Sequence, residues 1–326
     1  MFKYFLIVIL MLLLMATMVA AEGDGGYAGS FLQVPIGARP TAMGGAYRAV
    51  SDDGAGVLFN PAGLANLPKK LFGTSYRAMQ LDRKMGYVTV LFPAKNQATI
   101  GAHWLYAGSG SVAMRDVNGR KIGEDFSQNN HAFSVLFAKR FESYLSVGVK
   151  LNYYLATIPE VTANSIGIDL GFMLYVDQLL DREKREELPV KDIQVGLTVK
   201  NLGMKYPWNS EKFNQVYSSD TRGYEQDDKV PIEVGLGAAA RFIKKKLLVA
   251  VDVLKNEEQS AEFHSGAEYF LKPEFALRAG FGDKRFTVGT GYVFNIGRQA
   301  LAIDYAFSTD KADEGSEHIF SFDLLF

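Results

Sequence analysis

The chain has 326 residues, and its 35 Lys and Arg residues against 36 Asp and Glu residues give a formal net charge of -1. Near neutrality without a basic block argues against nucleic-acid binding, and the absence of cysteine excludes disulfide scaffolds, thiolate metal sites and thiol nucleophiles. With 48% apolar and 22% charged residues, the chain is too apolar to be disordered and too polar to be a bundle of membrane helices.

Residues 1–21 are predicted to form a secretory signal peptide. Lys3 precedes a continuous apolar run from Phe5 to Val19, which ends in small residues up to Ala21. The alternative is an uncleaved helical anchor, which needs about 20 apolar residues, but the polar stretch 22–26 cuts the run short. No cysteine follows that could carry a lipid. We therefore predict that the signal peptide is cleaved and the mature protein is exported.

The next segment, Glu22 to Lys69, is rich in small residues and lacks the alternation of a strand. Small residues suit close packing in a confined space. Asp52 or Asp53 can cap a short helical turn, and Asn60-Pro61 would end that turn and redirect the chain. We predict that residues 22–69 form a plug, called the hatch below, inside the sheet structure that follows.

From Lys70 to the end the dominant period is two, which is typical of strands. In the stretch 301–308, for example, Leu301, Ile303 and Tyr305 share one face, while Ala302 and Asp304 lie on the other. Counting all such runs gives about 14 strands. The predicted strands are 70–79, 85–93, 98–106, 131–139, 145–153, 166–174, 193–200, 232–242, 246–254, 261–271, 274–281, 285–295, 301–308 and 318–326.

The links between these strands alternate between short turns and longer loops, and the longest are 107–130 and 203–229. This layout is typical of outer-membrane barrels, in which periplasmic turns are short and outer loops are long. The link 177–191 is an exception, because it is long and highly charged although it falls on the short-turn side. It is interpreted as a solvated helical excursion or, alternatively, as a docking surface for a periplasmic partner.

Alternation alone fits either a membrane barrel or a water-soluble sandwich. An even strand number, aromatic residues near strand ends and a polar face rich in glycine favour the barrel, because a crowded interior needs small residues and a solvated face does not. The predicted fold class is all-β, a 14-stranded antiparallel transmembrane outer-membrane β-barrel over residues 70–326, with an N-terminal hatch.

The final predicted strand carries a row of apolar residues that ends at the last residue of the chain. We predict that this row faces lipid and resembles the C-terminal signal by which barrel proteins are handed to the assembly machinery. Its members are Phe320, Phe322, Leu324 and Phe326.

The hatch also carries a motif of small and polar residues between Gly37 and Ala65. Its members are Arg39, Met43, Gly44, Gly45, Asp52, Asp53, Asn60, Pro61, Ala62 and Gly63. This motif closely resembles the N-terminal signature of the PorV/PorQ family and, more broadly, of the FadL-type transporters of hydrophobic compounds.

The resemblance implies a 14-stranded barrel of the bacterial outer membrane with the hatch in its lumen. FadL-type proteins pass fatty acids or other apolar molecules through the hatch region and out sideways through the wall, whereas PorV members serve type IX secretion at the cell surface. We therefore expect passage of hydrophobic small molecules, or alternatively a shuttle or anchor for type IX-like protein export. The expected partners are outer-membrane lipid and the barrel assembly machinery, together with hydrophobic small molecules or secretion-system proteins.

The polar faces of the predicted strands place charges of both signs in the lumen. Such charges usually pair with one another or with the plug, and the alternative is a polar path or a carboxylate-binding spot, for which Arg278 and Arg285 are the candidate pair. The candidate luminal residues are Lys150, Asp169, Lys200, Arg241, Asp252, Glu268, Arg278, Arg285 and Asp304.

No arrangement of residues predicts an enzyme, a metal site or a cofactor. The histidines at 103, 131, 264 and 318 fall on different predicted strands. The stretch Gly108-Ser109-Gly110 lacks the spacing of a nucleophile elbow, which leaves an outer-membrane lipase only as a remote alternative.

Overall fold

The structure, a computed structural model, describes residues 28–116, 118–121, 123–217, 222–309 and 315–326. The predicted signal peptide lies outside these residues.

Fourteen antiparallel strands form one closed barrel, which confirms the predicted fold class. Each strand pairs with its neighbour along the barrel, and β1 closes the sheet against β16 with Leu71 opposite Leu325 and Ala78 opposite His318. The barrel strands are β1 (Leu71–Ala78), β2 (Lys84–Ala94), β3 (Ala98–Gly108), β4 (Asn129–Phe141), β5 (Leu145–Ile158), β6 (Val161–Tyr175), β7 (Lys191–Leu202), β10 (Glu233–Phe242), β11 (Leu247–Asn256), β12 (Glu262–Lys272), β13 (Phe275–Gly282), β14 (Arg285–Ile296), β15 (Gln299–Ser308) and β16 (Glu317–Leu325).

The apolar face of each strand points outward, which is the reverse of a water-soluble sandwich. On β16, Phe320 and Phe322 are 46% and 41% exposed on the outside, whereas Ser321 and Asp323 are buried inside. Leu324 and Phe326 continue the outward row, as predicted, and the role of this row in assembly stays a prediction. An exposed apolar belt around a charged interior is the polarity of a membrane barrel.

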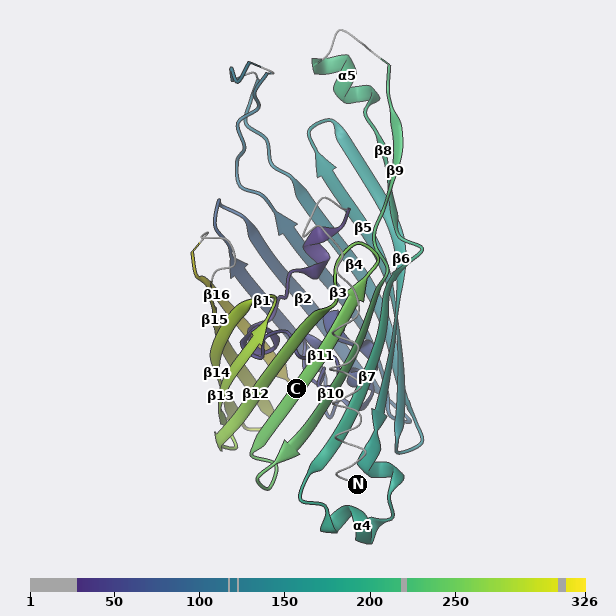
Figure 1. Ribbon diagram of the computed structural model, residues 1–326, viewed down its shortest axis with the longest axis vertical. Coiled ribbons are helices and arrows are strands. Elements are labelled where there is room, and N and C mark those ends of the chain that lie inside the picture. The colour runs from purple at the N-terminus through teal and green to yellow at the C-terminus, as the bar shows by residue number, and fades with distance from the viewer. Residues whose placement is uncertain (1–27, 117, 122, 218–221, 310–314) are drawn as a thin grey trace.

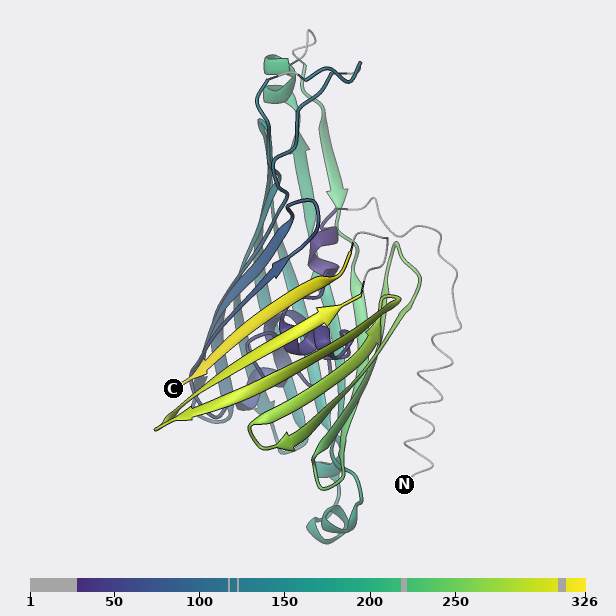
Figure 2. The same ribbon diagram turned by 90° about the vertical axis from the view of Figure 1, so that its left-hand side faces the viewer.

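The two ends of the barrel differ, as Figures 1 and 2 show. At one end, the long-loop end, the chain between β7 and β10 forms a hairpin of β8 (Lys205–Asn209) and β9 (Glu225–Lys229) that carries helix α5 (Glu211–Tyr217). The sequence had predicted only a long loop there. Strand β9 reads Glu-Gln-Asp-Asp-Lys and has no apolar alternation, because a hairpin that rises beyond the barrel has no lipid-facing row.

The opposite end, the short-turn end, carries helix α4 (Arg182–Glu187) after a short 3-10 helix, η3 (Val176–Leu179). None of the α4 residues is buried, which agrees with the predicted solvated helical excursion. Among the described residues, no helix has the length and apolarity needed to cross a bilayer.

The described part of the hatch, residues 28–69, lies inside the barrel (Figure 2). It contains η1 (Ser30–Gln33), α2 (Ala38–Ala42), α3 (Gly56–Phe59) and η2 (Pro61–Asn66). Helix α2 packs against β13 to β16, and η2 packs against β3 to β6. The hatch therefore touches distant sections of the wall.

Glycines in the wall allow this close approach. A Cβ atom on Gly280 would lie 2.2 Å from the backbone nitrogen of Gly44, a distance that real side chains do not reach. Gly44 itself has a φ of 65°, the left-handed conformation that favours glycine. In the sequence, the glycine-rich polar face favoured a barrel over a sandwich. In the structure, the hatch backbone lies against this face.

Candidate functional site

The centre of the hatch is held by Arg39, whose side chain is mostly buried on helix α2. Its Nε and Nη2 atoms donate to the two carboxylate oxygens of Glu268 on β12, at 2.8 and 2.9 Å. This is the bidentate geometry in which guanidinium and carboxylate groups bind most strongly. The third nitrogen, Nη1, donates to Asp52 at 2.5 Å and to the hydroxyl of Tyr47 at 2.8 Å.

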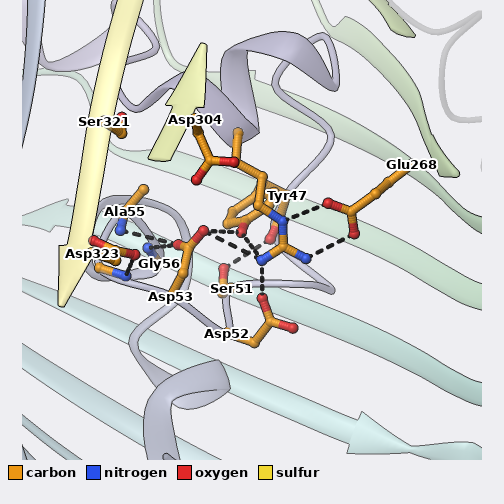
Figure 3. A network of polar contacts seen from close by, with 12 residues as sticks. Tyr47, Ser51, Asp52, Asp53, Ala55, Gly56, Glu268, Asp304, Ser321 and Asp323 are labelled. Atoms are coloured by element: carbon orange, nitrogen blue, oxygen red, sulfur yellow. Dashed lines mark hydrogen bonds and ion pairs between the residues drawn. The ribbon is translucent and has the colours of Figure 1, made fainter. Parts of the chain in front are cut away.

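Figure 3 shows Asp52, Asp53 and Glu268 converging on one guanidinium group, that of Arg39. Tyr47 donates its hydroxyl to Asp53 at 2.6 Å, and the other Asp53 oxygen accepts from the backbone nitrogens of Ala55 and Gly56 at the start of α3. Asp53 is therefore the carboxylate that caps the helical turn. Burial raises the pKa of its carboxyl group, and the nearby Arg39 charge opposes that rise.

The wall extends this group of charges. Glu268 also accepts from Nε of Arg278 on β13 at 2.8 Å, and Arg278 donates in turn to Asp304 on β15 at 2.6 Å. One chain of ion pairs thereby connects the hatch to three strands of the wall, β12, β13 and β15. We refer to Arg39, Tyr47, Asp52, Asp53, Glu268, Arg278 and Asp304 as the Arg39 cluster.

A second arginine of the hatch anchors the next section of the wall. The backbone nitrogens of Tyr47 and Arg48 both donate to the carboxylate of Asp252 on β11, at 2.9 Å. The Arg48 side chain pairs with Glu233 on β10 at 2.6 Å, and Lys200 on β7 lies 3.3 Å from the same carboxylate. The motif prediction did not include Arg48, although a charged residue among the small residues of the hatch was a signal for it.

Asn60 fixes the hatch to strand β6, the neighbour of β7 in the wall. Its side-chain nitrogen donates to the carbonyls of Arg48 and of Phe172 on β6, at 2.8 and 3.1 Å, and its oxygen accepts from the nitrogen of Ala62. The side chain is fully buried. Pro61 takes the first position of η2, where the absent N–H costs nothing.

The remaining members of the motif are buried packing residues. Met43 is fully buried, and Ala62 and Gly63 lie in η2 against the wall. Gly45 lies beside His264, whose ring contacts the carbonyl of Gly44 at 2.6 Å. These residues provide close contact and carry no charge of their own.

The other predicted luminal charges lie in separate places. Lys150 and Asp169 pair with each other at 2.9 Å on β5 and β6. Arg241 lies at the short-turn rim and pairs with Asp192 at 3.6 Å, so it is a rim residue and does not belong to the central lumen. The suggested pair of Arg278 and Arg285 is not formed: Arg278 is engaged in the Arg39 cluster, whereas Arg285 pairs with Asp283 and Glu317 at the other end of the strands.

The residues considered for catalysis are engaged elsewhere. Ser109 donates to the carbonyl of Gly110 and accepts from the nitrogen of Gln128. Within the described part of the chain, no group of three or more His, Cys, Asp or Glu residues is arranged to hold a metal ion.

On the long-loop side of the hatch lies a luminal cavity of about 210 Å³. Hatch and wall both contribute apolar side chains, among them Leu32, Leu58, Met85 and Leu105. The lining also carries charges of both signs, from Arg48, Lys200, Glu233, Glu262, Asp283 and Arg285. On the short-turn side lies a polar pocket of about 250 Å³, lined by Asp52, Asn66, Arg140 and Tyr175 among others. The hatch therefore separates a compartment with a mixed apolar and charged lining from a polar one.

Known proteins were compared with this chain at the levels of sequence and structure. No protein-family model and no curated protein matches the sequence. The fold resembles the toluene transporter TbuX of Ralstonia pickettii, at 14% identity and a TM-score of 0.61 over 89% of this chain and 98% of that one. It also resembles the Pseudomonas putida toluene transporter TodX (13%, TM-score 0.59, 89% and 98%) and a Pseudomonas aeruginosa FadL homologue (10%, TM-score 0.53, 86% and 95%).

At these identities the likeness concerns the fold alone. It covers 86–89% of this chain and nearly the whole of each compared chain. The chain has the fold of the FadL-type outer-membrane transport barrels.

Proposed function

We propose that this protein lies in the bacterial outer membrane and lets hydrophobic small molecules cross it, with the luminal cavity above the hatch as their binding site. The observation that carries the proposal is the cavity itself. An apolar cavity of about 150 Å³ is large enough to bind benzene, so a volume of about 210 Å³ accommodates a single-ring compound or one segment of an acyl chain. The structural neighbours include proteins described as toluene transporters, which agrees with ligands of this class.

The mixed lining suits a molecule with one polar end. Leu32, Leu58 and Leu105 would contact an apolar body, while Arg48 and Lys200 would attract a carboxylate. Both cations already contact Glu233, so a fatty acid would have to compete with that carboxylate. An uncharged aromatic hydrocarbon would not, and we therefore favour small aromatic hydrocarbons over fatty acids.

Binding to the purified barrel tests this proposal. Isothermal titration with toluene and with oleate is compared between the wild type, Leu58→Trp, which fills the cavity, and Leu277→Trp, which adds the same bulk on the outside where Leu277 is 45% exposed. The proposal predicts that only Leu58→Trp abolishes toluene binding. Equal binding by the two variants would refute the assignment of the cavity.

A second function, a surface shuttle or anchor for type IX-like secretion as in PorV/PorQ proteins, is favoured by a different observation. The β8–β9 hairpin extends beyond the barrel, and it exposes the apolar side chains of Val216 (58%) and Tyr224 (68%). Exposed apolar groups beyond the membrane belt suit contact with another protein.

Shortening this hairpin separates the two functions. Replacement of residues 209–225 by a short Gly-Ser linker would alter the set of secreted proteins under the secretion hypothesis, and it would leave toluene binding intact. An unchanged secreted profile would count against the secretion hypothesis.

A further inference from the structure

The short-turn rim of the barrel carries a cleft that the transport proposal does not use. It lies between the β10–β11 turn and the β12–β13 turn and has a volume of about 320 Å³. Five of its lining residues are basic and none is acidic. The lining consists of Arg241, Lys244, Lys245, Lys246, Phe270, Leu271, Lys272 and Pro273.

Part of this positive charge has no acidic counterpart. Asp192 on β7 pairs with Arg241 and with Lys245, at 3.6 and 2.9 Å. Among the described residues, no carboxylate pairs with Lys244, Lys246 or Lys272, and these three side chains are exposed. Glu274, the acid nearest to the cleft in sequence, follows Pro273 and is only partly exposed. The cleft therefore has an excess of positive charge.

The β10–β11 turn has an unfavourable backbone conformation at three of its residues. Ile243, Lys244 and Lys245 are three successive residues with left-handed φ angles of 49°, 52° and 70°. Residues other than glycine and asparagine rarely adopt this conformation, and such strain concentrates at sites that bind ligands.

An apolar surface begins directly beside the cleft on the outer face of the barrel. The strand register aligns Phe242, Leu247, Tyr269 and Leu277 in one outward row across β10 to β13. Ile243 and Leu271, at the cleft itself, are 59% and 49% exposed. Positive charge at the rim is thus adjoined by an apolar row that includes Tyr269, as at a membrane interface.

We propose that this rim cleft binds the phosphate headgroup of an anionic glycerophospholipid of the periplasmic leaflet, with the acyl chains along the outward row. Clusters of Lys and Arg beside an apolar surface are a recurrent way of binding such headgroups. The outward apolar row beside the cleft would hold acyl chains, which suits a lipid better than a soluble ligand. This inference rests on the proposed outer-membrane location and is independent of the molecule transported.

Native mass spectrometry of the full barrel tests the inference. The protein is exchanged into mixed micelles with phosphatidylglycerol or phosphatidylcholine, and retained lipid is counted. The wild type is expected to retain phosphatidylglycerol selectively. The triple variant Lys244→Gln/Lys246→Gln/Lys272→Gln should lose roughly tenfold or more of that selectivity, since each lysine near an anionic headgroup contributes a several-fold effect.

The control removes the same number of charges from the same end without touching the cleft. Lys95→Gln/Lys139→Gln/Lys184→Gln changes three dispersed lysines of the short-turn end and should retain the lipid as the wild type does. Equal loss in both triple variants would overturn the proposal, because net charge would then explain the retention. Retention by the cleft variant at the wild-type level would overturn it as well.

A third comparison separates the lipid from free phosphate. Inorganic phosphate at millimolar concentration should not displace phosphatidylglycerol, because the lipid also contacts the outward apolar row. Full displacement would make the cleft a phosphate site and would contradict a lipid site. A boiling-dependent gel shift of every variant establishes that the barrel is closed, so that failure of lipid binding is distinguishable from failure of the outer-membrane barrel itself.

Discussion

The guanidinium group of Arg39 forms two parallel hydrogen bonds with the carboxylate of Glu268, and these residues are 229 positions apart in the chain. Arg39 belongs to the hatch and Glu268 to the wall, so this pair determines where the hatch sits. Because both groups are largely removed from water, the pair is costly to break from one side. Four predictions follow from this attachment of the hatch to the wall.

Glu268→Gln should destabilise the seated hatch strongly. The substitution leaves the buried charges of Arg39 and Arg278 without their shared partner, a loss of about 3–5 kcal/mol for a buried pair. We expect a higher ion conductance in planar bilayers and a lower free energy of unfolding in urea. Glu225→Gln, on the β8–β9 hairpin outside the barrel, is the matched control and should change neither quantity. Wild-type conductance in Glu268→Gln would show that the pair does not hold the hatch.

Arg39→Lys should raise the ion conductance above the wild-type value, but less than Arg39→Met does. A lysine supplies the charge, but it cannot form two parallel bonds to Glu268 while also reaching Asp52 and Tyr47. The conductance of Arg39→Lys should therefore lie between that of the wild type and that of Arg39→Met. If Arg39→Lys has the wild-type conductance, a positive charge alone is sufficient to hold the hatch, and the two parallel hydrogen bonds to Glu268 are not needed.

Gly280→Ala should displace the hatch without opening the barrel. The added Cβ atom would lie 2.2 Å from the backbone nitrogen of Gly44 and 2.3 Å from the carbonyl carbon of Met43, and neither backbone can yield locally. The expected result is a normal boiling-dependent gel shift together with raised conductance. Gly86→Ala is a milder control, since its Cβ would meet the carbonyl oxygen of Ser75 at 3.1 Å and nothing of the hatch. A wild-type conductance in Gly280→Ala would contradict the close contact between Gly280 and the hatch.

Asn60→Ala should loosen the attachment of the hatch to β6. It removes the hydrogen bonds to the carbonyls of Arg48 and Phe172 and the cap on Ala62. Each unsatisfied buried group costs about 1–3 kcal/mol. Limited proteolysis should then cleave the hatch faster than in the wild type, whereas Asn118→Ala, in an exposed loop, should not change the rate. Equal cleavage rates for Asn60→Ala and the wild type would show that Asn60 does not hold the hatch in place.

The barrel itself could be predicted from the sequence because its physical signal is local. A period of two over each strand identified all fourteen barrel strands, and the glycines of the polar face indicated a filled interior. The β8–β9 hairpin could not be predicted in this way, since polar strands such as Glu225–Lys229 leave no periodic trace. Its presence depends on pairing between β8 and β9 that no single segment encodes.

The sequence predicted which residues belong to the candidate site, but it did not predict which of them contact one another. Arg39, Asp52, Asp53, Glu268, Arg278 and Asp304 were all candidates from the sequence, but their assembly into one chain of ion pairs depends on the register of the strands and the path of the hatch. The same reasoning explains the incorrect pairing of Arg278 with Arg285. These residues lie on adjacent strands, yet the register places Arg278 opposite Gly289 and Arg285 opposite Gly282.

The central claim, that apolar molecules pass through the cavity above the hatch, is tested most directly by uptake into intact Gram-negative cells that lack other FadL-type channels. The measurement is the initial rate of radiolabelled toluene uptake by cells with empty vector, wild type, Leu58→Trp or Leu277→Trp, with lactose uptake as the measure of general leakage. Toluene uptake should be faster with the wild type and Leu277→Trp than with vector, Leu58→Trp should give no gain, and lactose uptake should be equal throughout. Toluene uptake with the wild type at the vector rate, or undiminished uptake with Leu58→Trp, would contradict the central claim.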